Sequence, residues 1–192
     1  YRQLEMNMPV QIPNLYMAWN VKSLNTAKNP QDAYALTIIQ SLLDGGISSR
    51  LQERLVRDRK ILTSINVSYD PYNRGDSLFI ISAIPAENVS LETAQKNVQA
   101  EMDLFKTELV NVAELDGVKS NFVSNLVYSQ DDIAGQAKMI GQLAVNGIDY
   151  RLLDQLPKHY QTVTSEDLKR IANIYFVREN LSVLHLMPES AQ

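Results

Sequence analysis

Residues 42–51 read LLDGGISSRL, and this stretch indicates how the chain folds. Apolar residues recur at helical spacing before it, and the pair Gly45-Gly46 predicts the end of that helix, because glycine adopts the backbone conformations that close helix C-termini. One of the two serines that follow can cap a second, short helix reaching about Arg59. The stretch therefore predicts two helices joined by a tight glycine turn.

Strand patterns lie on both sides of this element. Between 14 and 22 apolar and polar residues alternate strictly, which predicts a half-buried strand. The stretch 64–69 alternates in the same way, and residues 181–187 form a closing strand. Residues 78–84 are apolar at nearly every position, so we expect a central strand covered on both faces.

Helical patterns fill most of the second half. A long amphipathic stripe begins at Ser90, and further apolar stripes follow at 115–126, 133–145 and 150–160. Thr164 or Ser165 predicts the cap of a last helix. The order of elements predicts one α+β domain over residues 1–192, with helices on one face of a largely antiparallel sheet.

Composition excludes several classes of function. The 192 residues carry 18 Lys and Arg against 22 Asp and Glu, which leaves no basic field for nucleic acid. Without cysteine there is neither a disulfide nor a thiolate metal site. No apolar run approaches the roughly 20 residues of a membrane span.

Because the chain starts at Tyr1 and not at methionine, we interpret it as an excised or processed segment, with a signal and a partner domain expected upstream.

Few residues suit catalysis. His159 and His185 are 26 positions apart, and neither has a carboxylate or a second histidine at a ligand spacing such as i+4. We expect His185 to be a hydrogen-bonded structural histidine in the closing strand. The sequence also has no phosphate-binding glycine loop and no G-x-S-x-G elbow. We therefore predict no catalytic residue and no metal ligand on this chain.

A row of arginines is the one polar pattern that is hard to dismiss. Arg50, Arg54 and Arg57 fall at spacings of four and three, which places them on one face of an α-helix. They are either a solvated basic face or a fork aimed at a peptide carbonyl or carboxylate at the edge of a cavity. Both interpretations stay open at this point.

The quoted stretch, together with Arg57-Asp58-Arg59, resembles the helix, glycine turn and helix in the second domain of the pitrilysin/insulysin family, which includes mitochondrial processing peptidase. The tail from Val163 to Ala172 and the strand that follows at 180–183 are similar to the end of that domain. The resemblance implies a LuxS/processing-peptidase-like metallohydrolase fold. It also implies the non-zinc half of a clamshell peptidase, whose zinc lies in a homologous partner on an inverted H-x-x-E-H helix.

The resemblance also implies a substrate site. In this family the second domain contributes an arginine, matching Arg57, and a tyrosine seven residues later, where this chain has Ser64. A serine hydroxyl cannot reach as far as a phenol, so we do not expect Ser64 to support the transition-state oxyanion as the family tyrosine does. Either another residue compensates, with Tyr69 the nearest candidate, or the domain is a scaffold. The turn at Gly45 and Gly46 is shorter than the glycine-rich loop of processing peptidases.

Two functional hypotheses follow from the resemblance. The first is a substrate-binding, chamber-forming domain of a zinc endopeptidase, inactive alone, whose sheet edge pairs with an extended peptide and whose Arg57 holds a carbonyl or acidic group. The second is an inert structural pairing subunit. Either would need a homologous zinc-bearing domain or subunit, fused upstream or encoded separately. Family analogy favours the periplasm and leaves the cytoplasm open.

Overall fold

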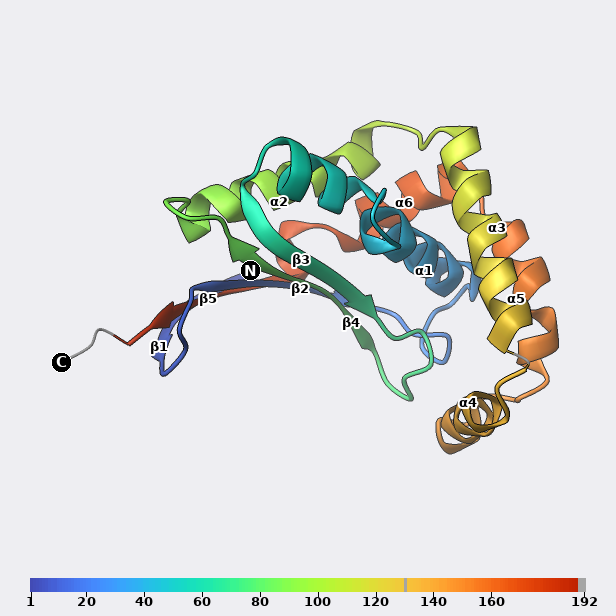
Figure 1. Ribbon diagram of the computed structural model, residues 1–192. Coiled ribbons are helices and arrows are strands. Elements are labelled where there is room, and N and C mark those ends of the chain that lie inside the picture. The colour runs from blue at the N-terminus through green and yellow to red at the C-terminus, as the bar shows by residue number, and fades with distance from the viewer. Residues whose placement is uncertain (130, 190–192) are drawn as a thin grey trace.

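The computed structural model describes residues 1–129 and 131–189, which form one sheet with helices packed against it (Figure 1). The sheet has the strand order β1-β5-β2-β4-β3. The strands are β1 (Arg2–Met8), β2 (Asn14–Val21), β3 (Leu62–Tyr69), β4 (Ser77–Pro85) and β5 (Leu181–Pro188). The helices are α1 (Gln31–Asp44), η1 (Gln52–Asp58), α2 (Leu91–Thr107), α3 (Val112–Ser129), α4 (Ile133–Val145), α5 (Leu152–Gln161), α6 (Ser165–Tyr175) and the short η2 (Arg178–Asn180).

The helices cover one face of the sheet, as the sequence predicts. Figure 1 shows α1, α2 and α6 over the sheet, with α3 and α5 stacked beyond α1 and with α4 at the periphery. All strand pairs are antiparallel except β1 with β5, which run parallel. The predicted α+β class is therefore confirmed. None of the helices in the described part of the chain is both long and apolar enough to cross a membrane.

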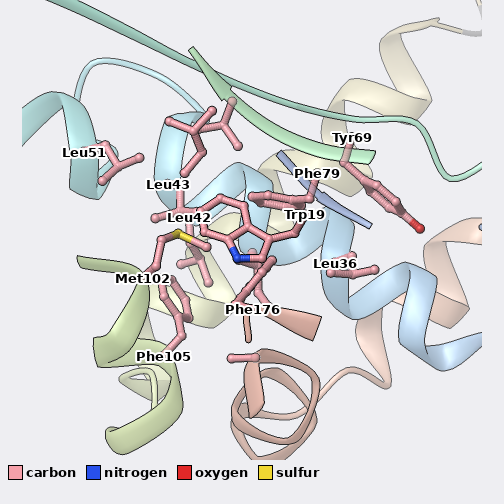
Figure 2. Packing of buried hydrophobic residues seen from close by; sticks show 14 of the residues in the cluster. Trp19, Leu36, Leu42, Leu43, Leu51, Tyr69, Phe79, Met102, Phe105 and Phe176 are labelled. Atoms are coloured by element: carbon pink, nitrogen blue, oxygen red, sulfur yellow. The ribbon is translucent and has the colours of Figure 1, made fainter. Parts of the chain in front are cut away.

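The core lies between the sheet and α1, α2 and α6. The alternation in β2 places Leu15, Met17 and Trp19 on the helix side with no exposed surface. The rings of Trp19 and Phe176 pack edge-on, with their centroids 5.6 Å apart. The Phe79 ring centroid lies 4.9 Å from that of Phe176 (Figure 2). These aromatic contacts join β2 and β4 to the end of α6 and bring the two ends of the chain into one core.

The prediction that β4 is covered on both faces is wrong. Phe79 and Ile81 are fully buried, whereas Leu78 is 44% exposed, because helices cover only one side of the sheet. β4 is interior only in the plane of the sheet, between β2 and β3.

The strand β1 was not predicted. Its signal is the alternation of Leu4, Met6 and Met8 with polar neighbours, although every residue of β1 is exposed. Leu4 pairs with Leu184 of β5 in the register. The strand lies at the edge of the sheet and buries little apolar surface. Its sequence therefore resembles that of an exposed linker.

The glycine turn ends α1 as predicted. A Cβ on Gly45 would collide with the carbonyl oxygen of Ser41, and Gly46 has φ +141°, a conformation that other residues rarely adopt. The helix that follows differs from the prediction, since it becomes a π-helix at Gln52–Asp58. Its i→i+5 hydrogen bonds widen the winding, so Arg54 and Arg57, which are three residues apart, no longer line up as they would in an α-helix.

Candidate functional site

Arg57 lies on the π-helix η1 beside the glycine turn. A hollow of about 400 Å³ is lined by Asp44, Gly46, Ile47, Gln52 and Arg57. The Arg57 side chain is 46% exposed, and its only ion pair in the described structure is a loose one, with 3.9 Å between Nη2 and Oε1 of Glu53. Ile47 is 79% exposed at the same hollow. The Arg57 guanidinium and the apolar side chain of Ile47 are thus both exposed to solvent at this hollow.

Arg50 is held firmly by other elements. Its Nε and Nη2 donate to the two carboxylate oxygens of Glu114 in α3, at 2.7 and 2.6 Å. The guanidinium carbon also lies 4.8 Å from the ring centroid of Phe105 in α2. This bidentate, stacked arrangement is typical of an arginine that fixes neighbouring elements.

Arg54 is paired with a buried carboxylate that the sequence analysis missed. Glu101 of α2 is 3% exposed, and its Oε2 accepts a hydrogen bond of 2.7 Å from Arg54 Nη1. Its other oxygen lies 3.1 Å from Nη2 of Arg59. The signal for Glu101 is its place within the apolar stripe of α2, next to Met102. The three arginines of the predicted row therefore do not form one fork, and only Arg57 points freely toward solvent.

The outer edge of β3 is partly closed by side chains. The Val67 amide donates to Asp44 Oδ2 at 2.9 Å, and its carbonyl accepts from Gln40 Nε2 at 3.2 Å. Gln52 Nε2 donates to the carbonyl of Ile65 at 2.9 Å. Backbone groups that an added strand would need are thus already satisfied between 65 and 67.

Ser64 and Tyr69 differ in their freedom. Ser64 is exposed on β3, on the opposite face from the buried Ile65, and it does not line the hollow of Arg57. The Tyr69 hydroxyl donates to the Lys22 carbonyl at 2.7 Å, and burial raises the pKa of Tyr69 well above its usual range. Tyr69 is therefore committed to the core and does not replace the tyrosine that the family resemblance implies.

The histidines occupy two kinds of environment. His159 stacks on Tyr34 with ring centroids 4.9 Å apart. His185 is 1% exposed, and its Nε2 lies 2.8 Å from Gln95 Oε1, which confirms the expected hydrogen-bonded histidine. Its Nδ1 faces the carboxylates of Glu5 and Glu92, each 3.9 Å away. The sequence does not reveal this group, because its members come from three distant segments and have no ligand spacing.

The sequence profile described as the peptidase M16 inactive domain matches residues 2–122. The chain belongs to the peptidase M16 family, as its inactive domain. This confirms the resemblance to the zinc-free second domain of the pitrilysin/insulysin type. Among curated relatives, the zinc protease PqqE of Helicobacter pylori is 34% identical over 164 residues, which is 82% of this chain and 35% of that protein.

Solved structures share the M16 fold. A protease from Helicobacter pylori has a TM-score of 0.88 at 23% identity, over 97% of this chain and 44% of that one. A peptidase M16 inactive domain from Pseudomonas fluorescens gives 0.79 at 20% identity, over 100% of this chain and 44% of that one. The inactive peptidase domain of a Bordetella parapertussis protein gives 0.81 at 16% identity, over 97% of this chain and 96% of that one. The chain thus spans less than half of the Helicobacter proteins it matches.

Proposed function

We propose that this M16 inactive domain is the substrate-binding, chamber-forming domain of a zinc-dependent endopeptidase and works with a homologous zinc-bearing domain or subunit. The family's catalytic zinc does not fit this chain. The H-x-x-E-H motif is absent from the sequence. Its two histidines are separated in role as well, since His159 stacks on Tyr34 while His185 is buried against Gln95. The nucleophilic water and general base must come from the partner.

The freedom of Arg57 is the observation that carries the proposal. Arg50 and Arg54 are held to α3 and α2 by close ion pairs. Among the described residues Arg57 has only a loose contact, with Glu53, and it lies beside an open hollow. A guanidinium in this position can donate two hydrogen bonds to a peptide carbonyl or an acidic side chain. In this proposal Arg50 and Arg54 hold η1 in place, and the turn at Gly45 and Gly46 shapes the hollow.

The closed edge of β3 limits how a peptide can bind. Since the backbone groups of Ile65 and Val67 are satisfied by Gln52, Asp44 and Gln40, strand addition along this stretch would require three hydrogen bonds to break. We therefore propose that the peptide is held here through Arg57, with Ser64 as a weaker contact, and not through an extended ladder along β3.

The second candidate function is an inert pairing subunit of the same fold. Ser64 in place of the family tyrosine favours it, because the exposed serine offers only a short hydroxyl and Tyr69 is committed to Lys22. The two functions differ in one respect that can be measured: only the first requires Arg57 to contact substrate.

The experiment is peptide cleavage by the intact peptidase carrying Arg57→Ala. We expect kcat/KM to fall about 10- to 100-fold, the usual effect of losing a charged hydrogen bond to substrate. Arg151→Ala is the matched control, because Arg151 is also an exposed arginine with a nearby acidic partner, Asp149 at 3.4 Å. Equal activity of the two variants would reject the substrate role of Arg57 and leave the pairing subunit as the better account.

A further inference from the structure

A buried histidine and two glutamates meet at the edge of the sheet, away from the hollow of Arg57. Glu5, Glu92 and His185 each offer a ligand atom, and these atoms all lie within 4.8 Å of one another. The strand register sets Glu5 of β1 beside His185 of β5. Glu92 lies in the first turn of α2. Three segments far apart in the sequence thus converge on one point.

The imidazole is buried and oriented. The His185 side chain is 2% exposed, while those of Glu5 and Glu92 are 69% and 60% exposed. Gln95 lies three residues after Glu92, on the same face of α2, and its Oε1 is 2.8 Å from His185 Nε2. Because an amide oxygen only accepts, His185 Nε2 donates this hydrogen bond, and Nδ1 is the ring nitrogen that faces the two carboxylates. Metal-binding histidines usually have such a partner on the second ring nitrogen.

The two glutamate carboxylates beside Nδ1 favour the binding of a cation. A lone pair and two carboxylates repel one another unless a proton or a metal ion lies between them. Their combined negative charge exceeds the roughly half unit of positive charge at the N-terminus of α2.

We propose that His185 Nδ1, Glu5 and Glu92 bind one divalent transition-metal cation, with Zn²⁺ as the best match to one imidazole and two carboxylates. Zinc bonds of about 2.0–2.2 Å place tetrahedral ligand atoms about 3.4 Å apart. The observed separations of 3.9 Å from Nδ1 to each glutamate oxygen need only a small inward movement. The exposed glutamates can make this movement while Gln95 holds the ring.

The bound ion would fasten the edge strand. All residues of β1 are exposed, so little apolar burial holds this strand to β5. A metal ligated by Glu5, His185 and Glu92 links β1 to β5 and α2, and its binding free energy adds to the stability of that edge. This inference does not depend on the proposed peptidase role.

The test is titration of the metal-free chain with Zn²⁺ by calorimetry, and with Co²⁺ by visible absorption. The matched Bordetella inactive domain has nearly the same extent, which supports using this chain by itself. We expect one equivalent of Zn²⁺ to bind and to raise the Tm. Glu5→Gln and Glu92→Gln should each weaken binding at least tenfold, and Gln95→Leu should weaken it about 10- to 100-fold.

Two controls separate this site from adventitious binding. His159→Gln removes the other histidine, and Glu166→Gln removes another exposed glutamate in a helix first turn, that of α6. Both should bind Zn²⁺ like the parent chain. The substituted glutamates are exposed, so their variants should fold, and circular dichroism checks this. Absence of saturable binding, or equal affinity in the parent chain and the Glu5→Gln and Glu92→Gln variants, would overturn the proposal.

Discussion

Glu101 of α2 and Arg54 of η1 form an ion pair of 2.7 Å in which the carboxylate is almost fully buried and the guanidinium reaches solvent. Arg59 meets the other carboxylate oxygen at 3.1 Å. One buried acid therefore pairs with an arginine inside the π-helix that carries Arg57 and with the arginine that directly follows this helix. A buried charge is strongly unfavourable without its partners, so this contact ties the position of the hollow to the stability of the fold.

Removal of both arginines should cost more than the sum of the single losses. Arg54→Ala and Arg59→Ala each leave Glu101 one cation, and each should destabilise by about 1 kcal/mol, because the guanidiniums are partly exposed. The double variant leaves a buried, unpaired carboxylate and should lose about 3–5 kcal/mol. Urea unfolding measures these values. Adding Glu101→Gln to the double variant should recover stability, whereas simple additivity would show that the pairs act independently.

Replacement of Gly46 by alanine should destabilise the chain by about 1–3 kcal/mol, because φ +141° strains any residue with a Cβ. Gly75→Ala is the control, since a Cβ there meets nothing within 4 Å. Its effect should stay within about 0.5 kcal/mol. Equal stabilities of the two variants in thermal unfolding would mean that the turn adapts and that the hollow does not depend on glycine.

Ser64→Tyr supplies the phenol that the family resemblance places seven residues after the arginine. If Arg57 contacts substrate, the added hydroxyl should raise kcat/KM of the intact peptidase by several-fold, since one oxyanion donor contributes about 2.7–4 kcal/mol where the geometry is optimal. Ser68→Tyr is the matched control, because Ser68 is exposed on the same face of β3. A similar change in both variants would assign the effect to general hydrophobicity.

Removal of the capping box at α6 should cost about 1 kcal/mol. Thr164 Oγ1 accepts from the Asp167 amide at 3.1 Å, and Asp167 Oδ2 accepts from the Thr164 amide at 3.1 Å. Thr164→Ala breaks the first of these bonds and should lower the Tm by a few degrees. Thr107→Ala is the control, because its hydroxyl bonds only to carbonyls of its own helix, α2. An equal loss in both would argue against capping as the cause.

The local features of the fold could be predicted from sequence because their causes are local. Alternation placed Trp19 in the core, and the Thr164 cap and the Gly46 turn follow from backbone hydrogen bonding and steric limits. The edge strand β1 was missed although Leu4 and Met6 alternate with polar neighbours, because it is held mainly by backbone pairing with β5, which the sequence does not display. The prediction that β4 is covered on both faces was wrong, because the apolar content of a strand does not reveal whether helices pack on one side of the sheet or on both.

The site could be predicted only in part for the same reason. Arg57 was identified from the arginine spacing and from the family resemblance. That it differs from Arg50 and Arg54 could not be predicted, because their partners Glu114 and Glu101 lie 64 and 47 residues away in the chain. The π-helical winding also removed the single face that the spacing implied. The convergence of Glu5 and Glu92 on His185 depends on strand register and helix placement, which no spacing rule contains.

We propose that this chain contributes to a peptidase whose hydrolytic activity requires a zinc-bearing counterpart. The direct measurement is hydrolysis of a fluorogenic peptide by the chain alone with added Zn²⁺, and by the chain together with its zinc-bearing counterpart, joined or separate. The account predicts no hydrolysis by the chain alone and clear hydrolysis with the counterpart, reduced by Arg57→Ala. Hydrolysis by the purified chain alone, abolished by a chelator, would contradict it.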